Sequence, residues 1–212
     1  MNFKAYRRRT EYDRDKINKR DNFIFLNSKY CLKNQTVLAG DSITEIFNME
    51  LFNEYVKASS QFVYNRGISG DTSDRLCERF DETVLALEPK NLVLLIGTND
   101  LTLINDVEYV FSNIEQVVAK TRSELPQCRI LLQSVYPVHV KRTKKNKNIL
   151  KLNAMLKTLA DKYDVTYLDI HTLLRADNGG FDERYTYDGL HPNAPGFDVA
   201  AGEIIKALLQ SR

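Results

Sequence analysis

An apolar run gives way to a helical pattern in the segment Thr36-Val37-Leu38-Ala39-Gly40-Asp41-Ser42-Ile43-Thr44-Glu45. Its first four residues form a short apolar run, which predicts a buried strand. Gly40 and Asp41 interrupt the run, and Ser42 then opens a helical pattern. A serine at such a strand-to-helix turn can expose both its hydroxyl and its backbone N–H, as a nucleophile requires.

The same residues allow a second interpretation. Ser42-x-x-Glu45 has the spacing of a capping box, in which the serine only satisfies the unpaired N–H groups of the helix. Taken alone, the segment favours the cap. A histidine paired with a carboxylate, together with oxyanion donors elsewhere in the chain, would favour the nucleophile instead.

The composition is that of an ordinary globular protein. The 212 residues predict a single domain with a full core, and 43% of them are hydrophobic and 27% charged. No apolar run approaches the ~20 residues of a membrane span, and the charged first residues do not resemble a signal peptide. Cys31, Cys77 and Cys128 are odd in number and lack metal-ligand spacing. We therefore expect free thiols in a reducing, cytoplasmic compartment.

Basic residues are concentrated near the N-terminus. Residues 1–36 carry ten Lys and Arg against four Asp and Glu, whereas the net charge of the whole chain is +2. A basic arm can bind an anionic partner, but it is more often a solvated helix face. We predict that residues 1–35 form a basic helical segment, with a helix over residues 11–30, packed on a domain of residues 36–212.

Apolar strands alternate with helices along the rest of the chain. The predicted strands lie at residues 36–39, 61–65, 91–96, 129–135 and 165–170, and the predicted helices at 43–57, 71–87, 106–124, 149–163 and 194–209. This alternation indicates a parallel sheet covered by helices on both faces, with the most apolar strand in its centre. Ligands of such sheets bind at the carboxyl ends of the strands, where the polar loops of this chain meet.

Candidate catalytic groups occupy these loops. Ser42 follows the first strand, and His191 lies after the fifth, three residues beyond Asp188. A carboxylate at that spacing can orient the imidazole and stabilise the imidazolium. The backbone N–H groups of Ser42 and Gly70 and the side-chain amide of Asn99 can donate to a developing oxyanion. Each feature alone also has a plainer interpretation, as a loop hydrogen bond, a positive-φ turn or a helix cap.

Four short motifs occur in the order of a known family. They are Gly40-Asp41-Ser42, Asn65-x4-Gly70, Gly97-x-Asn99-Asp100 and Asp188-x-x-His191. Together they resemble the motifs of the GDSL-type, or SGNH, hydrolases, whose domain would cover nearly the whole chain. Ile43 replaces the leucine of the usual lettering, at a position that varies in the family. The resemblance implies a flavodoxin-like three-layer α/β/α sandwich with a five-stranded parallel sheet.

The resemblance also implies roles for five residues. Ser42 would be the nucleophile, His191 the base and Asp188 the residue that orients it. Gly70 and Asn99 would complete the oxyanion hole with the N–H of Ser42. The implied reaction is hydrolysis of an ester through an acyl-enzyme, with no metal and no organic cofactor. With this set complete, the nucleophile becomes the favoured interpretation of Ser42.

The motifs are compatible with several classes of ester. The resemblance covers proteins that cleave acetyl groups from sugars, acyl chains from lipids, and aryl esters. Because the loops offer few apolar residues for a long acyl tunnel, we expect a short-chain, acetyl ester such as an acetylated carbohydrate. A lipid or lysophospholipid acyl hydrolase, or an acyltransferase using the same residues, is the alternative.

The remaining basic and histidine residues have less specific interpretations. The run at residues 141–147 can steer an anionic substrate or form a solvated loop and helix start. His171 is expected to be a hydrogen-bonded structural residue, and His139 is expected to face solvent. A binding protein that uses its basic patches on nucleic acid or an acidic membrane is a weaker hypothesis, so we expect a small-molecule ester as partner and no nucleic acid. A homodimer is compatible with the domain, but no pattern requires one.

Overall fold

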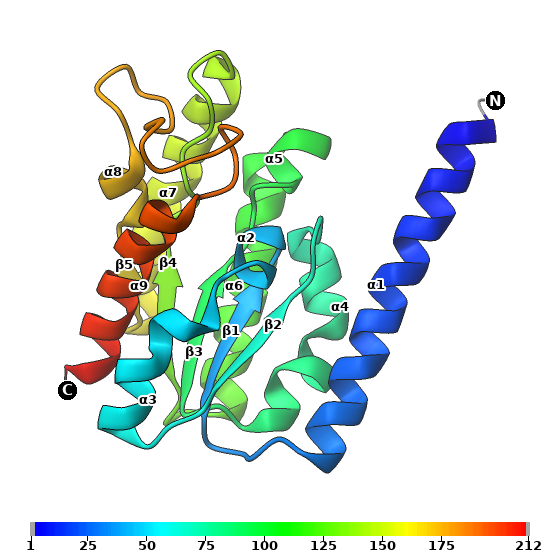
Figure 1. The fold of residues 1–212 in the computed structure, drawn as a ribbon, viewed down its shortest axis with the longest axis vertical. Helices are drawn as coiled ribbons and strands as arrows, with labels where there is room; N and C mark the ends of the chain where they lie inside the picture. Colours follow the sequence, from blue (N-terminus) through cyan, green and yellow to red (C-terminus); the bar gives the residue numbers. More distant parts are fainter. Residues whose placement is uncertain (1–2, 211–212) are drawn as a thin grey trace.

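A computed structural model describes the backbone of residues 3–210 and the side chains of residues 14–210 apart from residue 143. This part of the chain forms a five-stranded parallel sheet in the order β2-β1-β3-β4-β5 (Figure 1). The strands are β1 (Thr36–Gly40), β2 (Val63–Gly67), β3 (Asn91–Leu95), β4 (Arg129–Gln133) and β5 (Thr166–Leu168). The predicted parallel sheet, with its third strand in the centre, is confirmed. Residues 1–2 and 211–212 of the two predicted segments lie outside the described residues.

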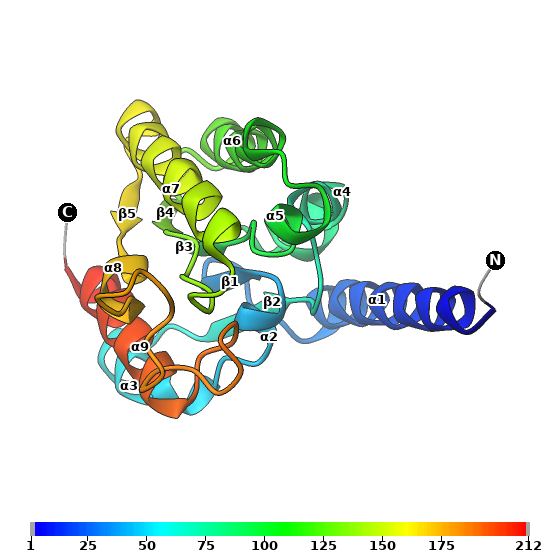
Figure 2. The ribbon, with the colours of Figure 1, turned by 90° about the horizontal axis from the view of Figure 1, so that it is seen from above.

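Helices cover both faces of the sheet, as Figure 2 shows from above. One face carries α4 (Ser73–Thr83), α6 (Val107–Glu124) and α7 (Thr143–Tyr163), and the other carries α3 (Asn53–Ser59), α8 (Ile170–Leu174) and α9 (Ala194–Leu209). Because side chains alternate along a strand, Leu92 and Leu94 of β3 enter the first core, whereas Val93 and Leu95 enter the second. The predicted three-layer α/β/α sandwich is therefore confirmed.

Helix α1 (Phe3–Lys29) begins earlier than the predicted helix at residues 11–30. It packs against α4 at the side of the sheet that ends in β2, and its N-terminal end extends beyond the other helices (Figure 2). Among residues 3–210, no helix combines the length and the apolar character that a membrane crossing needs.

Several helix boundaries differ from the prediction. The segment predicted as helical at residues 43–57, in one piece or two, is divided into α2 (Ser42–Glu45), the 3₁₀ helix η1 (Met49–Phe52) and α3. The side chain of Asn48 caps η1 through the N–H of Glu50. The helix predicted at residues 71–87 divides into α4 and the 3₁₀ helix η2 (Leu85–Leu87). Helix α7 begins six residues earlier than predicted, and the sequence pattern did not indicate α5 (Asp100–Leu103).

The short helix α2 lies directly against the end of β2. The side chain of Asn65 joins the two, since its amide donates to Thr44 O (2.6 Å) and its oxygen accepts from the N–H of Gly67 (2.9 Å). A Cβ on Gly67 would lie only 2.3 Å from the backbone nitrogen of Glu45. The position of α2, which begins with Ser42, therefore depends on a glycine at residue 67.

We predict that Gly67→Ala lowers the free energy of unfolding by about 1–3 kcal/mol, because the new methyl group overpacks the contact between α2 and β2. Gly202 provides the control, since it is exposed in α9 and a Cβ there would have no atom within 4 Å. Gly202→Ala should raise the same quantity by about 0.5–1 kcal/mol. Urea unfolding of the three proteins checks this, and a Gly67→Ala variant as stable as the parent would contradict it.

Candidate active site

Ser42 and His191 lie in hydrogen-bond contact. Ser42 is the first residue of α2, directly beyond the carboxyl end of β1, and His191 lies in the loop before α9. The distance from Ser42 Oγ to His191 Nε2 is 3.0 Å, although the two residues are 149 positions apart. Both are partly exposed. This is the geometry in which an imidazole can take the proton of a hydroxyl.

Asp188 lies on the other side of the imidazole. Its Oδ2 is 2.7 Å from His191 Nδ1, and its Oδ1 accepts from the backbone N–H groups of His191 (2.7 Å) and Leu190 (2.8 Å). Partial burial opposes ionisation of Asp188, but these hydrogen bonds outweigh it and hold the pKa of the carboxyl below its ordinary value. The ionised carboxylate fixes the orientation of the ring and can stabilise an imidazolium.

The loop that carries Asp188 and His191 is closed on itself and packs on a neighbouring loop. Thr186 Oγ1 donates to His191 O (2.7 Å) and accepts from the N–H of Gly189 (2.9 Å). Gly189 has φ 75°, and its carbonyl accepts from the N–H of His139 (2.7 Å). A Cβ on Gly189 would lie 2.7 Å from that of His139. His139, expected to face solvent, is therefore half-buried against this loop.

Asp41, and not Ser42, caps α2. Asp41 Oδ1 accepts from the N–H of Ile43 (3.0 Å), whereas the hydroxyl of Ser42 points to His191. Glu45, the other member of the proposed capping box, accepts instead from Lys19 and from the N–H of Ser69. The capping-box interpretation of Ser42 is therefore wrong.

The three predicted oxyanion donors lie at the ends of adjacent strands, since β1 pairs with both β2 and β3. Gly70 follows β2 with φ 70°, and Asn99 follows β3 and directly precedes α5. The Asn99 amide donates one hydrogen bond to Asp71 O (2.9 Å), which holds it beside the Gly70 loop. An amide has a second hydrogen to donate. Ser42, Gly70 and Asn99 are all partly exposed.

Buried carboxylates lie beneath this edge. Asp100 accepts from both the N–H (2.9 Å) and the hydroxyl of Ser73, and so holds the start of α4 beside Asn99. Burial is the main cause that raises the pKa of Asp100. Asp100 therefore has the structural role that its motif also allowed, because it caps the start of α4, while the adjacent Asn99 donates to Asp71 O.

Asp41 is completely buried, and its Oδ2 has no hydrogen-bond partner among the described residues. Burial raises the pKa of Asp41 to about 7, with smaller contributions from the charges of Asp100 and Asp71 and with opposition from the N–H of Ile43. A carboxyl group with this pKa takes up a proton far more readily in the folded chain than in the unfolded one.

This difference predicts a pH dependence of stability. The ordinary pKa of Asp41 is 3.8 and its folded value is about 7. The contribution of this group to stability is therefore complete below pH 4 and is lost as the pH rises to 7, by roughly 4 kcal/mol. Asp41→Asn removes the titration, so its free energy of unfolding should rise relative to the parent over this range. Urea unfolding at several pH values tests this, and a constant difference between the two proteins would contradict it.

The basic run at residues 141–147 is only partly solvated. Lys145, in the first turn of α7, is 9% exposed, and its ammonium group donates to Thr102 Oγ1. Burial, with a contribution from Arg142, lowers the pKa of Lys145 to about 8, although Asp41 opposes the shift. This lysine therefore points inward, which corrects the interpretation of the whole run as a solvated segment.

His171 is buried, as expected of a structural residue, but its ring is not fully hydrogen-bonded. Its backbone N–H donates to Ser134 Oγ (2.7 Å), while Nε2 has no hydrogen-bond partner among the described residues. Burial lowers the pKa of its imidazole. The imidazole of His171 is therefore buried and neutral, and it takes no part in the contact between Ser42 and His191.

Sequence reasoning missed Tyr187. Its ring stacks on that of His191, with centroids 5.8 Å apart and planes 12° apart, and the residue is 65% exposed. The only signal was an aromatic residue directly before Asp188. The stacked ring lies against one face of the imidazole and is largely exposed to solvent.

The chain is similar to known proteins over most of its length. Residues 38–199 match the GDSL-like lipase/acylhydrolase family. Platelet-activating factor acetylhydrolase IB subunit alpha2 of Rattus norvegicus is 27% identical over 177 residues, which are 82% of this chain and 76% of the relative.

Two further similarities have different extents. N-acylneuraminate cytidylyltransferase of Escherichia coli O18:K1:H7 is 27% identical over 172 residues, which are 79% of this chain but only 38% of that protein's length. The crystal structure of a GDSL-like lipase from Bacteroides thetaiotaomicron superposes with a TM-score of 0.77 at 25% identity, covering 89% of this chain and 96% of the other.

Proposed function

The chain belongs to the GDSL-like lipase/acylhydrolase family and is an ester-bond hydrolase, and on this basis we propose that it is a serine esterase acting on a short-chain, acetyl ester through an acyl-enzyme on Ser42. The observation that supports this most directly is the continuous series of contacts from Asp188 to His191 (2.7 Å) and from His191 to Ser42 (3.0 Å). A hydroxyl, a base and a group that orients the base are the parts that nucleophilic catalysis needs.

In the proposed mechanism, His191 takes the proton of Ser42 as the hydroxyl attacks the ester carbonyl. The N–H groups of Ser42 and Gly70 and the amide of Asn99 stabilise the oxyanion. His191 then gives the proton to the leaving alcohol, and the acyl group remains on Ser42. Water repeats the same steps on the acyl-enzyme and releases the acid.

Two relatives support the two parts of the proposed substrate, its acetyl group and its carbohydrate alcohol. The rat protein is named for the removal of acetyl from platelet-activating factor, which favours a short acyl chain. The Escherichia coli protein is named for N-acylneuraminate, which is a carbohydrate, and this favours an acetylated carbohydrate as the substrate class. A lipid acyl hydrolase and an acyltransferase would use the same catalytic groups.

We predict that Ser42→Ala lowers kcat by at least about 10⁴-fold and that Asn99→Ala lowers it by about 10²–10³-fold, because they remove the nucleophile and one oxyanion donor. Asn113→Ala is the control. It also removes an asparagine amide, but this amide is buried and donates to Ser73 Oγ (3.0 Å), and it has no proposed role as an oxyanion donor. Its kcat should stay within about threefold of the parent. Full activity in Ser42→Ala would exclude the mechanism, and full activity in Asn99→Ala would remove Asn99 from it.

The acyl preference is tested with aryl esters from acetyl to long acyl chains. For a short-acyl esterase, kcat/KM should be highest for acetyl and fall with chain length, and Ser42→Ala should abolish every signal. A preference for long chains would replace this proposal with a lipid acyl hydrolase. Acyl transfer to an added sugar in preference to water would replace it with an acyltransferase.

A further inference from the structure

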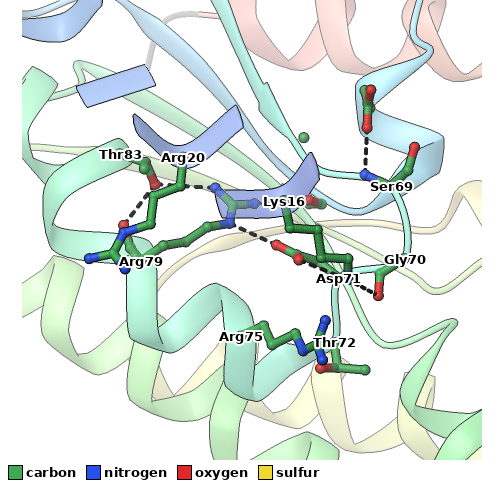
Figure 3. A network of polar contacts seen from close by, with 12 residues as sticks. Lys16, Arg20, Ser69, Gly70, Asp71, Thr72, Arg75, Arg79 and Thr83 are labelled. Carbon is green, nitrogen blue, oxygen red and sulfur yellow. Dashed lines mark hydrogen bonds and ion pairs between the residues drawn. The ribbon is translucent and has the colours of Figure 1, made fainter. Parts of the chain in front are cut away.

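Helix α1 lies outside the segment that matches the family, yet its side chains reach the loop that carries Gly70 (Figure 3). Lys16 Nζ donates to Gly70 O (2.7 Å) and lies 3.4 Å from Asp71 Oδ1. Only 10% of the Lys16 side chain and 2% of the Asp71 side chain are exposed. Burial of an ammonium group is costly unless it is paired and hydrogen-bonded. Lys16 is therefore not part of a solvated helix face.

A second lysine of α1 holds the same loop through α2. Lys19 lies three residues after Lys16, on the same side of the helix, and its ammonium group pairs with the carboxylate of Glu45. That carboxylate also accepts from the N–H of Ser69. Partial burial opposes ionisation of Glu45, but Lys19 and Ser69 outweigh it and lower the pKa of the carboxyl.

These contacts fix the two peptide groups on either side of the Gly70 N–H. This N–H belongs to the peptide that joins Ser69 to Gly70. The preceding peptide is held at Ser69 N by Glu45, and the following one is held at Gly70 O by Lys16. Because peptide groups are planar, fixing both neighbours determines where the N–H between them points. Gly70 itself has no side chain to restrict its rotation, so the restriction must come from such contacts.

We propose that Lys16 is a positioning residue for ester hydrolysis, acting through Gly70 O to direct the Gly70 N–H at the oxyanion. The inference rests on the proposed function, because it requires Gly70 to be an oxyanion donor. Loss of the Lys16 ammonium group should loosen this peptide selectively at Gly70 O, since the N–H of Asp71 in the same peptide keeps its hydrogen bond to Ile68 O (3.1 Å). Asp71 keeps its ion pair with Arg79 (2.7 Å) and its carbonyl keeps the hydrogen bond from Asn99 (2.9 Å).

The test compares Lys16→Met with two other variants of α1. Lys16→Met keeps a long unbranched side chain but loses the hydrogen-bond donor. Its kcat on an aryl acetate should fall by about 10- to 100-fold, while KM stays within about threefold of the parent. The fall is smaller than for complete removal of an oxyanion donor, because the Gly70 N–H is misdirected and not absent. Lys16→Arg keeps charge and donors and should recover most of the loss. Arg20→Met removes the exposed Arg20–Glu82 pair between α1 and α4 and should keep kcat within about twofold of the parent.

A boronic acid supplies a second readout, since its adduct with a serine hydroxyl is tetrahedral and anionic. Its affinity for Lys16→Met should fall by the same factor as kcat/KM, because both depend on the oxyanion donors. A change that only reduced the folded fraction would lower the number of active sites and leave this affinity unchanged.

The outcomes distinguish the positioning role of Lys16 from the proposed function. Parental activity in Ser42→Ala would overturn the proposed function and the positioning role with it. An inactive Ser42→Ala together with a Lys16→Met variant that matches the parent in kcat and boronic acid affinity would overturn the positioning role alone. Equal losses in Lys16→Met and Arg20→Met would also overturn it, since docking of α1 as a whole would then be the cause.

Discussion

The buried ion pair between Arg79 and Asp71 joins the three strand ends that form the candidate site. Its atoms are 2.7 Å apart, and the two side chains are 4% and 2% exposed. Arg79 also donates to Gly40 O at the end of β1 (3.1 Å), and Asp71 O accepts from Asn99 after β3. Removing one member of such a pair would leave an uncompensated charge in the interior, at a cost of about 3–5 kcal/mol. The relative positions of Ser42, Gly70 and Asn99 therefore depend on this pair.

The sheet could be predicted from simple rules, and these rules also place Ser42, Asp188 and His191 at one edge, although only the resemblance to the GDSL-type hydrolases made catalysis the favoured interpretation. The apolar run of β3 is buried on both faces, which indicates a central strand in a parallel sheet. Parallel strands bring all their carboxyl ends to one edge, so residues far apart in sequence meet there. Asp188 and His191 are three positions apart, and a single loop was enough to place them together.

The contacts that orient the loops could not be predicted, because they join residues that have no pattern in common. Lys16 is 54 positions from Gly70 and is one charge among many in a basic helix. Lys145 belongs to a basic run, yet its ammonium group donates to the hydroxyl of Thr102. At the start of α2, Asp41 and Ser42 both offer an oxygen for the cap; the helix begins at Ser42, so Asp41 caps it and the hydroxyl of Ser42 contacts His191.

The separation of Ser42 and His191 along the chain also determines when the site can come into existence. Contacts between distant residues form late, because the entropy of closing the intervening loop must be overcome first. A growing chain that ends before residue 188 would already contain the serine and all three donors, but it would lack both the base and the carboxylate that orients it. On the proposed mechanism, a nascent or partly folded molecule could not cleave esters while its sheet was still being assembled. Hydrolytic activity would then report that the chain has folded from the first strand through the loop that precedes α9.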